Sequence, residues 1–243
     1  MRTYRLDVAY DGRRFSGWAA QPGLRTVQGE LEEAMARVIG EQIPLTVAGR
    51  TDAGVHALGQ VASFETARPV ADTLPRALNS LTGHDLAITG LAEAPGFDAR
   101  RHAVSRRYRY RVEAASPPSP FEHGRALHWP YPLDREALGG CAAMLSGTHD
   151  FTAFTPTETD HVRFEREVLE AGWSDEDDRI VAFEIEADAF MRNMVRILVG
   201  TMLEVGGGRR GLADFERLLA GAPRPEAGPT APAHGLYLLA VSY

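Results

Sequence analysis

The sequence predicts an α+β protein with two subdomains, each holding several strands and a few helices. Alternating apolar and polar residues, the period of half-buried strands, occur in both halves of the chain. Between them lie segments with an apolar residue about every fourth position, which is typical of amphipathic helices. A proline-rich stretch at 116–124 interrupts the regular pattern. We therefore predict subdomains at 1–115 and 116–243.

The N-terminal half is predicted to start with a strand and a helix. Residues 4–10 alternate in polarity, as a half-buried strand does. Apolar residues then recur about every four positions up to Val38, with Thr26 suited to cap a helix and Gly40 to end it. Short strands at 45–48 and 60–64 flank the segment GRTDAGVH, so Asp52 is expected on a loop between ordered elements. A helix around 74–81 and a strand around 86–91 follow.

The rest of the chain repeats these ingredients. Residues 107–112 alternate tyrosine or valine with arginine, which puts aromatic side chains on one face of a strand and guanidinium groups on the other. Further helices are predicted at 134–145, 194–205 and 212–219, and further strands at 167–172, 180–187 and 235–243. The glycines at 206–208 are interpreted as a helix C-cap rather than a phosphate loop, because they follow a helix and lack a GKS or GKT ending.

Length and composition limit the class of protein. With 243 residues, of which 44% are hydrophobic and 24% charged, the chain can bury a substantial core. No apolar run approaches the roughly 18 residues that span a bilayer, so we expect no membrane and a cytoplasmic location. The single cysteine, Cys141, lies in the helix-like stretch ALGGCAAML and is expected to be buried there as a small hydrophobic residue. With one thiol and no HExxH pattern among the eight histidines, no metal site is expected.

The charged residues are unevenly distributed. The net charge of −7 taken alone opposes nucleic-acid binding, because binding a polyanion depends on neutralising its phosphates. However, all 26 basic residues are arginines, and six of them lie between Arg100 and Arg111, interleaved with tyrosines. Arginine grips phosphates bidentately and stacks on bases. This cluster, which includes Arg107 and Arg109, predicts a local RNA-contacting surface, and a solvated charged strand face is the alternative.

Six separated segments identify a family. They are YDGRRFSGW, TVQGELEEA, AGRTDAGVHALGQV, SRRYRYRV, FMRNMVRILVGTMLEVG and GPTAPAHGLYLLAV. In this order, over Tyr10 to Tyr243, they resemble the A-type family of tRNA pseudouridine synthases. The resemblance implies the pseudouridine synthase fold, with mixed, mainly antiparallel sheets and two subdomains that meet at a central cleft. It also implies an isomerase that makes pseudouridine at positions 38, 39 and 40 in the anticodon arm of tRNA, as a homodimer without a cofactor.

The resemblance also assigns roles to single residues. Asp52, in GRTDAGVH, matches the catalytic nucleophile of the family. Tyr110 matches the tyrosine that contacts the target base, and Arg196, in NMVR, matches the arginine that pairs with the catalytic aspartate. One departure is Ala19, because the family usually has glutamine after GW. That departure affects any polar contact made from this position and leaves the chemistry untouched.

A positioned carboxylate suits this isomerisation, which breaks the N1–C1′ bond of uridine, turns the base over and rejoins it through C5. Such a group can act as a nucleophile or base at an anomeric carbon, and it must be ionised. Burial beside a flipped base would raise its pKa unless an arginine lies near. Arg196 is the preferred partner of Asp52, since an arginine among apolar residues needs pairing. Arg50 is then left to hold the loop or contact phosphate, and the sequence leaves open whether Asp52 attacks the base or the ribose C1′.

Tyr110 and His56 each have two interpretations. Tyr110 can offer a face to a base taken out of its stack, which is worth roughly 1–3 kcal/mol, or it can simply pack in the core. His56 is of the type that commonly acts as a general acid or base near neutral pH. Because the isomerisation needs no second titrating group, we expect His56 to shape the loop or contact RNA.

Two other functions are compatible with parts of the sequence. A catalytically silent RNA-binding or chaperone protein would use the same arginine and tyrosine surface, but it would need neither Asp52 nor Arg196. A glycosidase or nucleosidase would use Asp52 as one of two carboxylates, and no second carboxylate accompanies it in the motif. The isomerase is therefore the preferred hypothesis.

Overall fold

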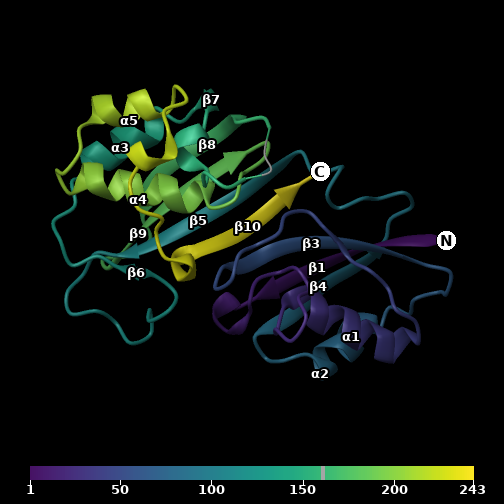
Figure 1. Cartoon of the computed structure of the whole chain (residues 1–243). Helices are drawn as coiled ribbons and strands as arrows, with labels where there is room; N and C mark the ends of the chain where they lie inside the picture. The colour runs from purple at the N-terminus through teal and green to yellow at the C-terminus, as the bar shows by residue number, and fades with distance from the viewer. Residues whose placement is uncertain (160–161) are drawn as a thin grey trace. The chain divides into compact units, whose positions relative to one another are not determined.

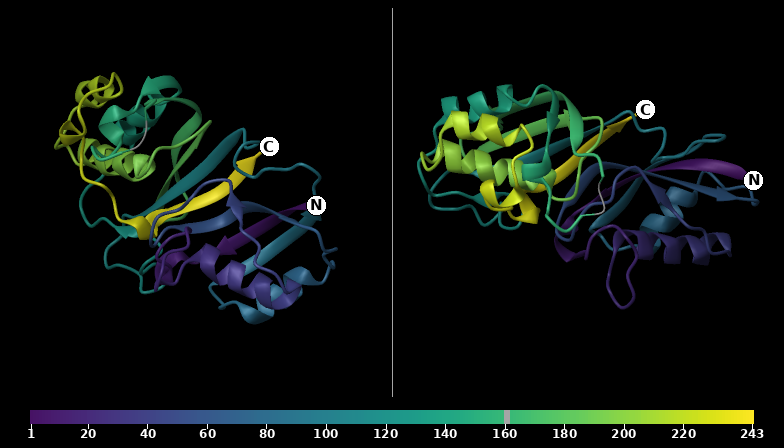
Figure 2. Two further views of the ribbon diagram at one scale, coloured as in Figure 1. Left: turned by 45° about the vertical axis from the view of Figure 1, so that its right-hand side comes forward. Right: turned by 45° about the horizontal axis from the view of Figure 1, so that its top comes forward.

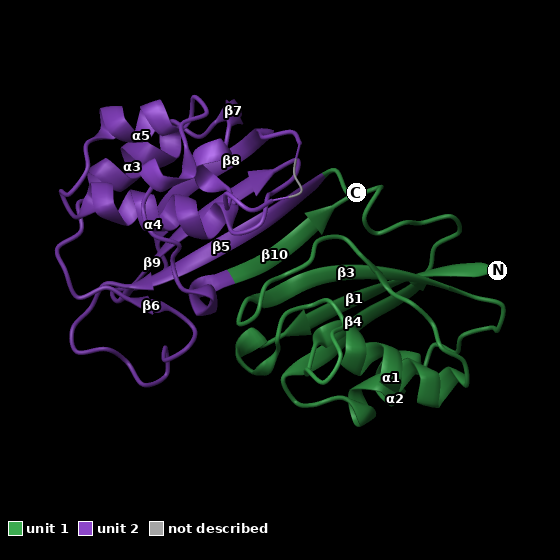
Figure 3. Cartoon of the chain, in the orientation of Figure 1, with its two compact units in different colours: residues 1–104, 237–243 green, residues 105–236 purple. Residues whose placement is uncertain are grey.

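The chain forms two compact units, each with several strands and helices. The computed structural model describes residues 1–159 and 162–243 (Figure 1). Unit 1 comprises Met1–Val104 and Tyr237–Tyr243, and unit 2 comprises Ser105–Leu236 (Figure 3). Within each unit the strands are mainly antiparallel and helices pack against them, so the predicted α+β class is confirmed.

The division into units differs from the predicted boundary after residue 115. Strand β5 (Ser105–Glu113) pairs along its length with β9 (Ile180–Ala187) and therefore groups with unit 2. The last strand, β10 (Leu236–Ser242), pairs with β3 (His56–Thr66) and therefore groups with unit 1. Pairing between segments so distant in the chain leaves no trace in local composition. The subdomains 1–115 and 116–243 stay a prediction.

The strands of unit 1 follow the order β4-β1-β3-β10, with the short strand β2 beside β3. β1 (Arg2–Tyr10) pairs antiparallel with both β3 and β4 (Leu86–Glu93). β2 (Thr46–Val47) is antiparallel to β3, whereas β10 runs parallel to it. Helices α1 (Val27–Ile39) and α2 (Leu74–Leu81) lie together beside these strands (Figures 1 and 2).

Helix α1 begins and ends where the sequence predicts. The Thr26 hydroxyl accepts a hydrogen bond from the Gly29 amide and so satisfies a free N–H of the first turn. Gly40 follows the helix with φ 79°, a left-handed conformation that suits glycine because it has no Cβ. Leu31 and Met35 on the inner side of the helix are fully buried. Amphipathic periodicity and capping thus agree on this element.

The strands of unit 2 follow the order β5-β9-β8-β7, with β6 beside β5. The long strands are antiparallel neighbours, and the helices of this unit pack on one side of them (Figures 1 and 2). The remaining bounds are β6 (Leu127–His128), β7 (Gly147–Asp150), β8 (Glu165–Asp175), α3 (Arg135–Ala143), α4 (Met194–Gly206) and α5 (Leu212–Leu218). Four short 3-10 helices are η1 (Gly12–Arg14), η2 (Thr152–Phe154), η3 (Arg224–Glu226) and η4 (Ala233–Gly235).

The core of unit 2 surrounds α4, which is buried on almost every side. The glycines after it act as the predicted C-cap: Gly207 donates to the Leu203 carbonyl, and Gly208 has φ 73°. Cys141 is also in the core, as predicted, and burial raises the pKa of its thiol to about 12. In the part of the chain that the structure describes, no helix has the length and apolar character needed to cross a membrane.

Candidate active site

Asp52 lies half-buried on the loop between β2 and β3, and a second loop holds this one in place. The Trp18 amide donates to the Thr51 carbonyl at 3.0 Å, one residue before Asp52. The Gly54 amide donates to the Phe15 carbonyl at 3.3 Å, two residues after Asp52. Residues 11–18, here called the bracing loop, therefore fix the backbone on both sides of the predicted nucleophile.

Two glycines of the bracing loop allow it to approach this closely. A Cβ at Gly12 would lie 2.0 Å from the Val55 carbonyl oxygen, which no real Cβ can do. Gly17 has φ 95°, and a Cβ there would lie 2.9 Å from the Thr51 carbonyl oxygen. Any larger residue would push the two loops apart. This explains physically why YDGRRFSGW accompanies GRTDAGVH in the sequence.

A buried hydrogen-bond chain holds the loop from the sheet side. The Tyr10 hydroxyl and the Thr51 hydroxyl are 2.7 Å apart, and the Gln60 amide donates both to Tyr10 and to the Gly49 carbonyl. Burial raises the pKa of Tyr10 to about 12, although its bonds to Thr51 and Gln60 oppose the rise. The folded protein therefore keeps the Tyr10 phenol protonated.

Replacing Tyr10 with phenylalanine is expected to change the alkaline stability. Between pH 10 and about 12 the unfolded chain releases the Tyr10 proton while the folded chain keeps it, so the free energy of unfolding falls as pH rises. Tyr10→Phe should reduce this slope by up to about 1.4 kcal/mol per pH unit, measured by urea unfolding across that range. Tyr131→Phe, which removes the hydroxyl of an exposed tyrosine, is the matched control. An unchanged slope in Tyr10→Phe would contradict the assignment.

His56 lies at the start of β3 and is buried, with only 2% of the residue exposed. Its Nδ1 accepts a hydrogen bond from the Gly12 amide at 3.2 Å, and its ring stacks on Tyr237 at 4.4 Å. Partial burial acts to raise the pKa of neighbouring Asp11, but hydrogen bonds from the Arg13 side chain and amide, together with the charge of Arg13, outweigh it and hold that pKa at about 2. This position favours loop shaping, and contact between His56 and RNA stays a prediction.

In unit 2, Tyr110 and Arg196 meet at one short segment. The Arg196 Nε donates to the Ala231 carbonyl at 2.7 Å, and the Ala231 amide donates back to the Arg196 carbonyl at 3.0 Å. The Tyr110 hydroxyl donates to the carbonyl of the next residue, Pro232, at 2.8 Å. Two of the three predicted site residues are thus joined through residues 228–232, here called the proline segment.

Asn193 orients Arg196 from the preceding turn. It has a positive φ of 61° at the position just before α4. Its side-chain oxygen accepts a hydrogen bond from Arg196 Nη1 at 2.8 Å. A left-handed backbone costs free energy for any residue with a Cβ, and such conformations cluster at functional sites. Asparagine is among the residues that tolerate this conformation best, so what the turn contributes is the bond that orients the guanidinium.

Tyr110 is fully buried in the structure. Its ring packs on Gly235, where a Cβ would lie 2.6 Å from the ring, and it sits on the face of β5 that the helices cover. Burial raises the pKa of Tyr110, and the charge of Arg196 opposes the rise. Core packing therefore describes its present surroundings, and stacking of a target base on Tyr110 stays a prediction.

The proline segment is seated directly on α4. A Cβ at Gly200 would lie 1.8 Å from the Pro229 carbonyl oxygen. The Gly228 amide donates to the Thr201 hydroxyl at 3.0 Å, and that hydroxyl donates to the Ile197 carbonyl at 2.8 Å. The sequence contains this segment within GPTAPAHG, but its role in holding Arg196 and Tyr110 is visible only in three dimensions.

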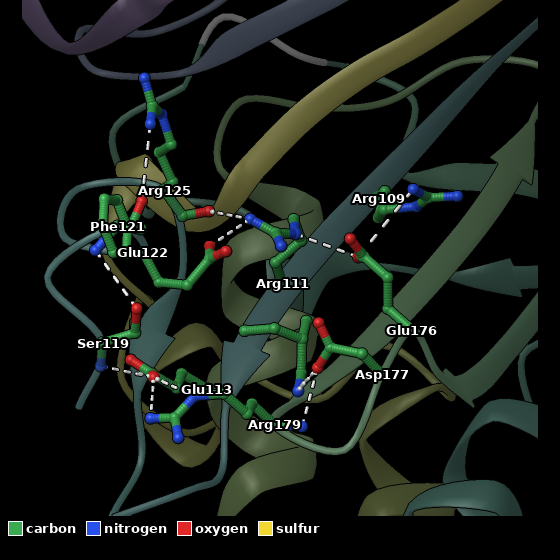
Figure 4. A network of polar contacts seen from close by, with 11 residues as sticks. Arg109, Arg111, Glu113, Ser119, Phe121, Glu122, Arg125, Glu176, Asp177 and Arg179 are labelled. Atoms are coloured by element: carbon green, nitrogen blue, oxygen red, sulfur yellow. Dashed lines mark hydrogen bonds and ion pairs between the residues drawn. The ribbon is translucent and has the colours of Figure 1, made fainter. Parts of the chain in front are cut away.

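Arginines at alternate positions of β5 form ion pairs with glutamates on the strand face opposite Tyr110. Figure 4 shows two of these arginines, Arg109 and Arg111, beside Glu176. Arg107 pairs with Glu186 at 2.7 Å and with Glu170 at 2.6 Å. Arg109 pairs with Glu184 at 2.6 Å. These cations are therefore largely neutralised within the sheet face. RNA contact by Arg107 and Arg109 stays a prediction, and it would require phosphate to replace glutamate.

Arg50 is exposed, and it makes no hydrogen bond or ion pair with any residue of 1–159 or 162–243. Arg50 could therefore make its predicted contact with RNA without first breaking a hydrogen bond or an ion pair. Over the same two ranges, no group of three or more histidine, cysteine, aspartate or glutamate side chains is arranged to hold a metal ion.

Comparisons with known proteins place the chain in a family. The sequence model described as tRNA pseudouridine synthase matches residues 8–100 and 141–243. A tRNA pseudouridine synthase A from Chloroflexus aurantiacus is 45% identical over all of this chain and 89% of its own length. One from a Geobacillus species is 42% identical over 98% of this chain and 97% of its own. A solved Cbf5-Nop10-Gar1 complex aligns over 82% of this chain and 54% of its own, with 10% identity and a TM-score of 0.36. The chain belongs to the tRNA pseudouridine synthase family.

Proposed function

We propose that this protein isomerises uridine to pseudouridine at positions 38, 39 and 40 in the anticodon arm of tRNA, with Asp52 as the catalytic nucleophile. Family membership supports uridine isomerisation in tRNA. The observation that carries the assignment of Asp52 is its doubly held loop, in which Thr51 and Gly54 are both bonded to the bracing loop. A reacting group gains rate when its position is fixed before the substrate arrives.

The proposed reaction needs no oxidant and no imported group. The Asp52 carboxylate attacks either the base or the ribose C1′, the N1–C1′ bond breaks and C1′ is rejoined to C5. The bond to Asp52 also breaks, which restores the free carboxylate. The proton on C5 is released, and N1 ends the reaction protonated. In this proposal Arg196 pairs with the negative charge of Asp52, and Tyr110 contacts the target base. The bonds of Arg196 to Ala231 and Asn193 support this role, because they fix the direction of the guanidinium in advance.

The proposed partner is the anticodon stem-loop of tRNA, bound by a two-fold homodimer. A dimer would let one tRNA contact two copies of a chain whose net charge is −7 and whose arginines are in part internally paired. If the protein is a homodimer, light scattering should give the mass of two chains.

The direct test uses an unmodified tRNA transcript carrying uridines at positions 38, 39 and 40. Incubation with the protein followed by chemical labelling should map new pseudouridine at those positions. A transcript with cytidine at all three positions is the matched control and should gain none. If the folded protein binds the first transcript and makes no pseudouridine in its anticodon arm, the proposed function is wrong and the silent RNA-binding alternative replaces it.

A further inference from the structure

Most arginines of unit 1 have a carboxylate partner. The paired residues are Arg2, Arg5, Arg13, Arg25, Arg37, Arg68 and Arg101. Arg14, Arg50 and Arg76 differ from them, because they are exposed and form no hydrogen bond or ion pair through their side chains in the described part of the chain. An arginine left unpaired on an acidic protein keeps its full charge for a partner outside the chain.

Two of these three residues flank the Asp52 loop. Arg50 precedes Thr51, whose carbonyl accepts from Trp18. Arg14 precedes Phe15, whose carbonyl accepts from Gly54. These two hydrogen bonds join the bracing loop to the Asp52 loop, so Arg14 and Arg50 are each next in sequence to a residue that makes one of them. Arg76 lies elsewhere, on α2.

Arg14 differs from its neighbour Arg13 in one respect. The Arg13 guanidinium is held by both carboxylate oxygens of Asp11, at 2.6–3.0 Å, and is thereby neutralised. Arg14 has no such partner. The acidic group on which its charge acts is Asp85, and both oxygens of Asp85 already accept hydrogen bonds from Arg25 at 2.7 Å. The charge of Arg13 is therefore neutralised within its own loop, whereas the charge of Arg14 stays exposed.

We propose that Arg14 is a second phosphate contact for the tRNA backbone, beside the predicted contact Arg50, so that cations from two loops hold the RNA on both sides of Asp52. This inference rests on the proposed function for the identity of the RNA. Exposed arginines bind phosphate through charge and bidentate hydrogen bonds, and each phosphate neutralised releases counterions. Arg14 then acts in binding and registration of the tRNA, while the chemistry belongs to Asp52.

The test measures tRNA affinity as a function of salt. Arg14→Gln should reduce the slope of log affinity against log salt by about 0.7–0.9, the value of one phosphate contact. Its affinity should fall several-fold at low salt, and pseudouridine formation at subsaturating protein should fall with the affinity. Arg14→Lys, which keeps the charge, should retain the slope. Arg76→Gln is the matched control, because it removes an equally unpaired and exposed arginine of the same unit.

Each outcome separates this inference from the proposed function. If the parent protein makes pseudouridine and Arg14→Gln keeps the parent slope, the inference is wrong and the function stands. An equal loss of slope in Arg76→Gln would also overturn it, since the effect would then be one of net charge. If Arg14→Gln alone loses the slope in a protein that makes no pseudouridine, the RNA contact stands and the proposed function fails. Unchanged thermal unfolding of each variant confirms that it is folded.

Discussion

Replacing Asp52 with asparagine is expected to abolish pseudouridine formation while leaving the protein folded. Asparagine has nearly the shape of aspartate but cannot act as the anionic nucleophile, and loss of a nucleophile typically lowers the turnover rate by about 10⁴–10⁶-fold. The loop is held through the Thr51 carbonyl and the Gly54 amide, which the substitution does not change. Single-turnover assays on the unmodified transcript measure the rate, and thermal unfolding measures the fold.

Two further variants make the result specific to Asp52. Asp52→Ala should be equally inactive and should keep much of the tRNA affinity, because Arg14 and Arg50 supply phosphate contacts in this proposal. Asp72→Asn removes an exposed carboxylate from the same unit and should leave the rate within about twofold of the parent. If Asp52→Asn kept more than about one hundredth of the parent rate, Asp52 would not be the nucleophile.

Elements with a sustained period could be predicted from the sequence, whereas short elements could not. α2 spans Leu74–Leu81 as predicted, and β9 spans Ile180–Ala187 as predicted. By contrast β6 has two residues and β7 has four, too few for any period to be recognised. These strands exist because longer neighbouring strands offer them hydrogen-bonding partners. Their formation is a tertiary effect.

The arginine cluster shows a second limit of the sequence. Arg107 lies opposite Glu186 and Arg109 opposite Glu184 in the antiparallel register of β5 and β9. Neither segment alone contains this register, so the sequence indicated an exposed cationic surface where the structure has ion pairs within the sheet. The sequence likewise did not predict that Arg13 is paired and Arg14 is not, because this depends on where the carboxylates of Asp11 and Asp85 lie in three dimensions.

The site residues illustrate the same division. The sequence motif GRTDAGVH predicted Asp52 on a loop, and the structure has it between β2 and β3. The supports of Arg196 and Tyr110 are carbonyl groups of the proline segment, and a backbone carbonyl has no side-chain signature that sequence reasoning can detect. What the sequence did contain was the pair of glycines, Gly200 and Gly228, that let this segment approach α4.

Gly200→Ala is accordingly expected to destabilise the protein and to remove activity together. An alanine Cβ would lie 1.8 Å from the Pro229 carbonyl oxygen, so either α4 or the proline segment must move. Overpacking against backbone typically costs about 1–3 kcal/mol or more, which exceeds the roughly 1 kcal/mol that alanine gains over glycine inside a helix. The shift would also displace the carbonyl that accepts from Arg196. Denaturant unfolding and single-turnover rates, measured where the variant is still folded, test both effects.

Gly139→Ala provides the matched control for this claim. Gly139 is also inside a helix, α3, and a Cβ there would meet nothing within 4 Å. The same chemical change should therefore stabilise the protein by up to about 1 kcal/mol and leave its rate unchanged. If both glycine variants were stabilised, the close seating of the proline segment on α4 would be wrong. If Gly200→Ala alone lost stability and kept full activity, the segment would support the fold without positioning Arg196 and Tyr110.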